Sequence, residues 1–231
     1  MLSIITINKD NVVGLQKTIA SLKQLKIRDF HWVFIDSNSS DTSVALANTF
    51  AKPGDVVLSE PDSGIYNAMN KGVPLATGEH ILFLNSGDTL ALGFDSITSL
   101  GVDPQCELTL FGFQIRNRRR FARHNWWRFW SMPTSHQAII YSKKLLAQNL
   151  FDEAYRLAAD FEHYLRVNQR PRIIERKRIV LINNEPYGSD QQLQRVLSEY
   201  RMALIQNEYP KWWAHFIYGL KTYYLKWALN K

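Results

Sequence analysis

The chain of 231 residues contains a single cysteine, Cys106, and no apolar run of the ~20 residues that a membrane-spanning helix requires. One cysteine excludes a disulfide framework and a cysteine-based zinc site, and it favours a reducing compartment. The apolar run at residues 2–7 is too short for the core of a signal peptide and runs into Lys9 and Asp10. Internal repeats and low-complexity tracts are also missing. We therefore expect a protein that stays in the cytoplasm.

The composition is that of a chain with a substantial core, because 45% of the residues are hydrophobic and 21% are charged. The formal net charge of +7 is unevenly distributed. Residues 1–107 contain 7 Lys/Arg and 12 Asp/Glu, whereas residues 108–151 contain 8 basic residues and no acid. Residues 209–231 contain 4 lysines and no acid, and the two basic segments hold six of the seven tryptophans. An acidic first half is thus followed by two basic, tryptophan-rich segments.

The first 90 residues alternate between short β-branched runs and stretches with helical spacing of apolar residues. This pattern predicts strands at residues 2–8, 31–36, 56–58 and 80–84, and helices at residues 12–25, 39–50 and 65–76. Such alternation indicates an α/β fold with a mainly parallel sheet flanked by helices. Ligands of these sheets bind beyond the carboxyl ends of the strands. Four acids follow predicted strand ends and suggest a site for a metal or cationic group that faces an anionic ligand: Asp36, Glu60, Asp62 and Asp88.

The second half has a less regular pattern. It predicts strands at residues 108–115, 137–141 and 172–183, the last as one strand or two, and helices at residues 143–149, 157–167, 190–208 and 211–231. Residues 116–130 are basic and aromatic without a clear period. No linker rich in Gly, Ser or Pro divides the chain. We therefore expect one domain over residues 1–208, with residues 209–231 as an appended amphipathic helix.

The most informative segment is residues 59–88, SEPDSGIYNAMNKGVPLATGEHILFLNSGD. It resembles the signature of the family 2 glycosyltransferases, particularly the bacterial exopolysaccharide enzymes of the colanic-acid type, over thirty residues without a gap. Weaker matches occur at residues 3–6, 35–42, 135–137 and 158–160, so the resemblance covers about residues 2–168. It implies a Rossmann-like GT-A fold and the inverting transfer of a sugar from a nucleotide-sugar donor.

The resemblance also implies a donor site. Asp36 corresponds to the family aspartate that accepts hydrogen bonds from the nucleobase. Asp88 corresponds to the last acid of the motif that holds a divalent cation, Mg²⁺ or Mn²⁺, against the diphosphate. The motif at residues 85–88 has only one carboxylate, and Asn67 stands where the family usually has an aspartate. Further donor contacts are implied for Thr6, Glu60, Asp62, Tyr66, Asn70, Lys71 and Asn85; Glu60 and Asp62 equally suit a turn.

Two later residues complete the expected chemistry. Asp160 is the candidate catalytic base, because residues 158–166 resemble the acid-bearing helix start of the family. An inverting transferase needs one carboxylate to take the proton of the acceptor hydroxyl as that oxygen attacks the anomeric carbon. It does not need the second, nucleophilic carboxylate of a retaining hydrolase. His136 is a candidate for contact with the diphosphate or the metal, and a structural role for this histidine is equally open.

The basic aromatic segments suit two kinds of partner. Arginines interleaved with aromatic residues are typical of nucleic-acid-binding surfaces and also of the membrane interface. Residues 211–231 have the length and composition of a helix that lies on an anionic leaflet, although such a helix could also close the core or a dimer interface. Two segments of the same character favour the membrane, with these residues in membrane or acceptor contact: Arg119, Arg120, Arg123, Trp126, Trp127, Trp212 and Trp213.

The sequence therefore favours an inverting transferase that is peripheral on the inner face of the cytoplasmic membrane. It would act on a lipid-linked saccharide in exopolysaccharide or cell-surface glycan synthesis, with no nucleic acid as partner. One alternative is a nucleic-acid-binding module. Another is an inactive, transferase-like assembly subunit, which the single carboxylate at residues 85–88 leaves open. A sugar-phosphate nucleotidyltransferase would need a glycine-rich phosphate loop near the start, where residues 1–20 contain only Gly14.

Overall fold

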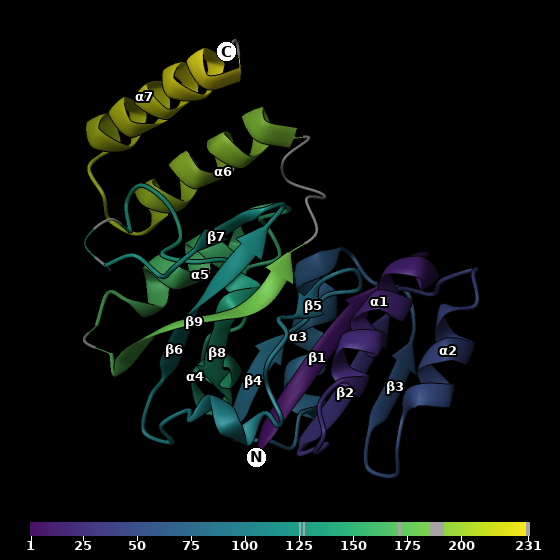
Figure 1. Ribbon diagram of the computed structural model, residues 1–231. Helices are drawn as coiled ribbons and strands as arrows, with labels where there is room; N and C mark the ends of the chain where they lie inside the picture. The colour runs from purple at the N-terminus through teal and green to yellow at the C-terminus, as the bar shows by residue number, and fades with distance from the viewer. Residues whose placement is uncertain (125, 127, 171, 185–191, 230–231) are drawn as a thin grey trace.

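The computed structural model describes residues 1–124, 126, 128–170, 172–184 and 192–229. Within them, nine strands form one sheet in the order β3-β2-β1-β4-β8-β6-β9-β5, with β7 paired to β6 (Figure 1). The strands are β1 (Leu2–Asn8), β2 (Phe30–Asp36), β3 (Val56–Ser59), β4 (His80–Phe83), β5 (Thr89–Leu90), β6 (Leu108–Ile115), β7 (Arg118–Arg120), β8 (Ile139–Ser142) and β9 (Ile174–Asn184). The helices are α1 (Val12–Lys23), α2 (Ser43–Phe50), α3 (Ile65–Leu75), α4 (Lys143–Gln148), α5 (Ala159–Val167), α6 (Leu193–Gln206) and α7 (Lys211–Leu229).

The first half is the parallel α/β unit that the sequence predicts. β1 pairs in parallel with β2 and β4, and β2 pairs in parallel with β3. Side chains of a strand alternate between the two faces of the sheet. Ile5 and Val33 belong to the core that α3 to α7 cover, whereas Ile4 and Trp32 belong to the core under α1 and α2. Because both faces are covered, β1 and β2 are buried throughout and their sequences are largely apolar.

The second half makes the sheet mixed. β8 runs antiparallel to β4 and β6, while β9 runs parallel to β6 and antiparallel to β5. The sequence predicts one or two strands over residues 172–183, and these residues form most of the single strand β9. The pairing register of β9 with β6 shifts opposite residues 110–113 of β6. β5 and β7 are only two and three residues long, too short for a periodic signal in the sequence.

The two C-terminal helices lie together at one end of the molecule (Figure 1). α7 buries one face, which includes Ala214, Ile217 and Lys221. Its other side carries an exposed stripe at every fourth residue, which we call the α7 stripe: Trp212, Phe216, Leu220 and Tyr224. The helix therefore closes part of the core with one face and presents aromatic side chains with the other. Among the described residues, no helix is long and apolar enough to cross a membrane.

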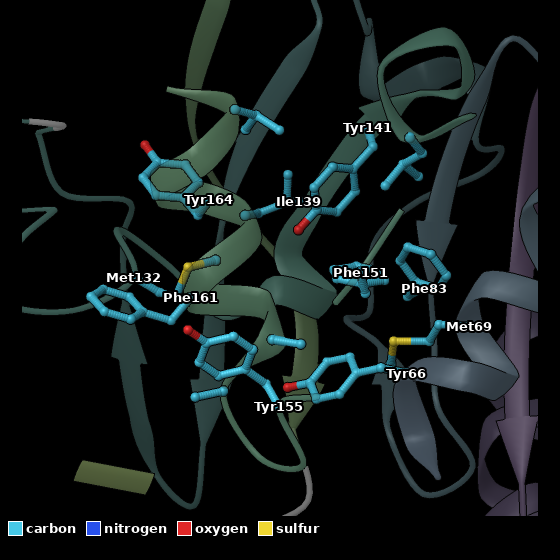
Figure 2. Close-up of a cluster of buried hydrophobic side chains, with 14 of the residues drawn as sticks. Tyr66, Met69, Phe83, Met132, Ile139, Tyr141, Phe151, Tyr155, Phe161 and Tyr164 are labelled. Atoms are coloured by element: carbon cyan, nitrogen blue, oxygen red, sulfur yellow. The ribbon is translucent and has the colours of Figure 1, made fainter. Parts of the chain in front are cut away.

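A buried aromatic cluster joins α3 and α5 to the sheet, and Figure 2 shows its members. The ring of Tyr66 on α3 lies 5.5 Å from that of Phe151, and Phe151 lies 5.6 Å from Phe83 on β4. Aromatic pairs at such distances stabilise a core beyond the area that they bury. The cluster fixes the two helices that carry the site described next.

Candidate active site

A cavity of about 1020 Å³ opens at the carboxyl ends of the strands, where ligands of α/β sheets bind. Its wall includes Asn8 at the end of β1, Ser37 after β2, Ile115 at the end of β6 and Asn184 at the end of β9. Eight of the residues that the sequence singled out also line it: Asp62, Tyr66, Asn85, Asp88, Arg120, Arg123, His136 and Asp160. Parts of the chain that are far apart in sequence thus share one site.

One corner of the cavity combines Asp88 with amide side chains. The side chain of Asn184 donates a hydrogen bond to Asp88 Oδ1 at 3.2 Å. The backbone of Asp88 is also held, because the Thr18 hydroxyl donates to its carbonyl oxygen at 2.8 Å. The Oδ1 atoms of Asn85 and Asn184 are buried and have no hydrogen-bond partner within the described residues. Buried polar atoms are normally paired, so two unpaired acceptors beside a carboxylate suit a cation or a hydrogen-bond donor.

His136 borders the same cavity. Burial lowers the pKa of His136 from its ordinary value, although the charge of Asp160 acts in the opposite direction. The ring is therefore neutral at pH 7, and its buried Nδ1 has no partner within the described residues. These residues also contain no group of three or more His, Cys, Asp or Glu that could hold a metal. A cation here would be held by one carboxylate and amide oxygens, which are hard ligands of the kind that Mg²⁺ and Mn²⁺ accept.

Asn184 is a site residue that the sequence did not reveal. It is the last residue of β9, and no motif or spacing distinguishes it from the preceding Asn183. The side chains of neighbouring strand residues point to opposite faces of a sheet. Asn183 donates to Thr89 at 3.3 Å, while Asn184 faces Asp88. The one sequence feature that could have identified Asn184 is its position at the carboxyl end of a predicted strand, where ligands of such sheets bind.

Asp160 lies in the first turn of α5 and is contacted by the signature helix α3. The hydroxyl of Tyr66 donates to Asp160 Oδ1 at 3.1 Å. Burial, and after it the charge of Asp160, raises the pKa of Tyr66 well above its ordinary value, so the phenol stays protonated and acts as the donor. Oδ1 is therefore held, and a carboxylate with one oxygen fixed is suited to general base chemistry through the other.

Asp36 is fully buried at the end of β2 and does not line the cavity. It accepts hydrogen bonds from the Asn8 side chain at 2.9 Å, from the Ser39 backbone at 2.8 Å and from the Ser59 hydroxyl at 2.8 Å. Burial acts to raise the pKa of Asp36, but these donors, with the Ser39 hydroxyl, hold it below its ordinary value. The carboxylate thus ties together the ends of three strands. Its contact with a nucleobase stays a prediction.

Four further predicted donor residues lie outside the cavity wall. Thr6 is buried and accepts a hydrogen bond from Trp32 at 3.0 Å. Lys71 pairs with Glu60 at 2.7 Å and donates to the Pro61 carbonyl at 2.8 Å. Asn70 donates to the Phe151 carbonyl at 2.9 Å and accepts from the Phe151 amide at 3.0 Å. These partners show Lys71, Glu60 and Asn70 holding loops around α3, and their contact with a donor stays a prediction.

The described residues that the sequence assigned to membrane or acceptor contact divide into those that line the cavity and those that do not. Arg120 and Arg123 line the cavity with Phe121, and Arg123 donates to the Met132 carbonyl at 2.9 Å. Trp126 and Trp212 are exposed, while Trp213 is half-buried against Phe129 with ring centroids 5.7 Å apart. Arg119 is exposed beside Gln114 at 3.4 Å. Trp127 lies outside the described residues.

The sequence of the chain is similar to those of known glycosyltransferases. The family model described as "Glycosyl transferase family 2" matches residues 3–93. An "Uncharacterized glycosyltransferase" of Mycobacterium tuberculosis is 31% identical over 179 residues, which are 71% of this chain and 67% of that protein. The chain belongs to glycosyltransferase family 2. A "PGL/p-HBAD biosynthesis glycosyltransferase" of the same organism is 27% identical over 195 residues, or 79% of this chain and 75% of the relative.

Solved structures show the same fold at low sequence identity. TarS 1-349 of S. aureus, in complex with UDP, superposes with a TM-score of 0.64 at 15% identity and covers 94% of this chain and 69% of its own. The mannosyltransferase PcManGT of Pyrobaculum calidifontis, in complex with GDP-Man and Mn²⁺, has a TM-score of 0.67 at 14% identity. The match covers 89% of this chain and 63% of PcManGT. The GT-A fold that the family resemblance implied is confirmed, and the family model and the relatives identify the chain as a glycosyltransferase.

Proposed function

We propose that the enzyme transfers a sugar from a nucleotide-sugar to a lipid-linked saccharide at the inner face of the cytoplasmic membrane, in the synthesis of an exopolysaccharide or other cell-surface glycan. One observation carries the proposal: a single cavity is lined by the Asp88 corner, by Asp160 and by Arg120 and Arg123. The Asp88 corner suits the binding of a diphosphate with its cation. Asp160 suits the removal of the proton from an acceptor hydroxyl, and the two arginines suit the binding of an acceptor phosphate.

At the donor end, a divalent cation fits the residues present. PcManGT is in complex with GDP-Man and Mn²⁺, and a glucosyl-3-phosphoglycerate synthase of M. tuberculosis with the same fold is in complex with Mn²⁺ and UDP. Here Asp88, Asn85 and Asn184 would hold the cation, with His136 beside them. The bound cation would neutralise the charge that develops on the diphosphate leaving group. Asp36 holds the loop that places Ser37 at the cavity wall, on the side proposed for the nucleobase.

At the reacting centre, Asp160 acts as the general base. The acceptor oxygen forms a bond to the anomeric carbon, the bond from that carbon to the diphosphate oxygen breaks, and the hydroxyl proton passes to Asp160. Tyr66 keeps Oδ1 of Asp160 engaged, which leaves Oδ2 for the acceptor hydroxyl. Attack from the side opposite the leaving group inverts the anomeric configuration. The products are the extended saccharide and a nucleoside diphosphate.

At the acceptor end, Arg120 and Arg123 suit a phosphate that links the saccharide to its lipid, because guanidinium groups bind phosphate oxygens through paired N–H donors. The α7 stripe and Trp126 supply exposed apolar side chains, all but Leu220 aromatic, within the basic segments. Aromatic rings favour headgroup depth, and basic residues favour an anionic leaflet. In this proposal residues 1–208 are the catalytic domain and residues 209–231 contact the lipid.

A donor screen tests the enzymatic half of the proposal. Thermal shift with UDP-, GDP- and dTDP-sugars, each with and without Mn²⁺ or Mg²⁺, should reveal one nucleotide class that stabilises the protein only with the cation. Asp88→Asn should abolish that stabilisation. Stabilisation by no donor, or an equal shift without a cation, would contradict the proposed donor site.

Co-sedimentation tests the membrane half. The protein should sediment with vesicles of phosphatidylglycerol and phosphatidylcholine, and less with phosphatidylcholine alone. A Trp212→Ser/Phe216→Ser variant should stay in the supernatant, whereas the control Ile27→Ser/Leu92→Ser, which removes two exposed apolar residues elsewhere, should sediment like the wild type. Tight, salt-sensitive binding to oligonucleotides without vesicle binding would instead support the nucleic-acid module.

A further inference from the structure

The segment that enters the catalytic helix is held by a residue of another helix. α5 begins at Ala159, and the side chain of its N-cap residue, Ala158, makes no capping hydrogen bond. Instead, three consecutive backbone N–H groups donate to the carboxylate of Glu199 on α6: Arg156 at 3.3 Å, Leu157 at 2.8 Å and Ala158 at 2.9 Å. Asp160 follows two residues later.

The environment of Glu199 suits this role. The residue is 8% exposed, and its ionic partner, Arg195, lies at 3.6 Å with a side chain that is 58% exposed. Successive backbone amides that converge on one anion form a nest, and hydrogen bonds to a charged acceptor are among the stronger ones. A carboxylate offers acceptors on both of its oxygens, whereas a glutamine at this position would turn an NH₂ donor toward backbone donors.

A second contact ties α6 to the same helix start. Tyr200, the neighbour of Glu199, stacks on Phe161 with ring centroids 4.0 Å apart and an interplanar angle of 13°. Phe161 follows Asp160 directly, and Tyr200 lines the cavity. α6 thus contacts the chain on both sides of Asp160, through the backbone before it and the ring after it.

We propose that Glu199 is a positioning residue, which holds the backbone before α5 so that the Asp160 carboxylate faces the acceptor hydroxyl. The proposal rests on the assignment of Asp160 as the base in the proposed function. Glu199 is not among the residues that line the cavity, so it acts through Asp160 and not through the donor. α6 is then part of the catalytic unit.

Glu199→Gln separates positioning from donor binding. The variant should lose about 10- to 100-fold in kcat, because a small displacement of a catalytic group is enough for losses of this size. The donor Kd, measured by calorimetry with the nucleotide-sugar and cation that the screen identifies, should stay within about twofold of wild type. An unchanged kcat, or a donor Kd that weakens as much as kcat falls, would overturn the proposal.

Glu162→Gln is the matched control. Glu162 is a buried glutamate of α5 itself, but it pairs with Arg166 at 2.9 Å and accepts nothing from residues 156–158. Its replacement should keep kcat within about threefold of wild type. An equal loss in both variants would show that any buried carboxylate near α5 matters, and would overturn the assignment of Glu199.

Two further measurements keep the test independent of variant folding and of the proposed function. In the wild type, the amides of residues 157 and 158 should be protected from hydrogen exchange, and rapid exchange would overturn the proposal whether or not Glu199→Gln folds. Asp160→Asn tests the base itself. If Asp160→Asn abolishes turnover while Glu199→Gln does not reduce it, positioning fails and the proposed function stands; if Asp160→Asn keeps full turnover, both fail.

Discussion

The hydroxyl of Tyr66 donates a hydrogen bond to Asp160 Oδ1 at 3.1 Å, joining two residues that are 94 positions apart in the sequence. Tyr66 lies in the glycosyltransferase signature on α3, and Asp160 lies in the first turn of the later helix α5. The aromatic cluster around Tyr66 in Figure 2 keeps its ring in place. The signature helix therefore contributes to the cavity wall and also holds the carboxylate of Asp160, the proposed base.

Tyr66→Phe should reduce kcat by about tenfold, because a hydrogen bond to a charged group is a comparatively strong one and here it fixes one carboxylate oxygen. The buried ring remains, so the fold and the donor Kd should change little. Single-turnover kinetics with saturating donor measures the effect. A kcat equal to that of the wild type would show that the contact does not orient Asp160.

Asn184→Ala should raise the cation concentration needed for donor binding by about 10- to 100-fold, the usual effect of removing a residue that orients a metal-binding carboxylate. The variant loses the donor to Asp88 and one of the unpaired oxygens. Asn183→Ala is the matched control, since Asn183 contacts Thr89 on β5. Titration of Mn²⁺ at fixed donor distinguishes the two, and equal effects in both would contradict the role of Asn184.

Lys221 should make the protein more stable at pH 9 than at pH 7. Its ammonium lies among aromatic rings, 4.3 Å from the centroid of Tyr200. Burial, and then the charge of Arg123, lower the pKa of Lys221 from 10.5 to about 7. Between these values the unfolded chain binds more protons than the folded one, so the contribution of Lys221 to stability rises with pH across this window and is lowest below pH 7.

Lys221→Met removes this dependence. The unfolding free energy of the wild type, relative to that of the variant, should increase by about 2 kcal/mol from pH 7 to pH 9, since one pKa unit corresponds to about 1.4 kcal/mol. Urea unfolding at the two pH values measures the difference. A constant difference would show that the amine has an ordinary pKa and that the rings compensate fully for burial.

Gly64→Ala should destabilise the protein by about 1–3 kcal/mol, the usual cost of a backbone conformation that side chains disfavour. Gly64 is the N-cap of α3 and has a φ of 139°. Gly219→Ala is the control: Gly219 lies within α7 with open space where a Cβ would lie, so alanine should stabilise the helix by up to about 1 kcal/mol. Equal effects of the two substitutions on urea unfolding would contradict this account.

The sequence predicts the first half of the fold well, because buried parallel strands such as β1 and β2 leave apolar runs and the helices between them leave a clear period. It predicts the shortest strands and the details of strand pairing less well. β5 and β7 are too short to leave a pattern, and β9 is held together across a register shift by its pairing with β6, which only the tertiary structure displays.

The site shows the same division. Tyr66 and Asp88, which the signature singled out, both line the cavity; Asp88 follows the recognisable strand β4, and Tyr66 lies in the first turn of the helix after β3. It could not show that Lys71 would be engaged by Glu60, since the direction of a side chain depends on its neighbours in space. Asn184 was missed because an asparagine at a strand end has no distinctive spacing.

The release of nucleoside diphosphate by the wild type and by Asp160→Asn, combined with donor binding by both, tests the central claim most directly. With the donor class found in the screen, Mn²⁺ present and water as the acceptor, the wild type should hydrolyse the donor and release the free sugar and nucleoside diphosphate. Asp160→Asn should bind the donor with an unchanged Kd and lose about 100-fold or more of the release rate, the usual contribution of a general base. Release by Asp160→Asn at the wild-type rate would contradict the account.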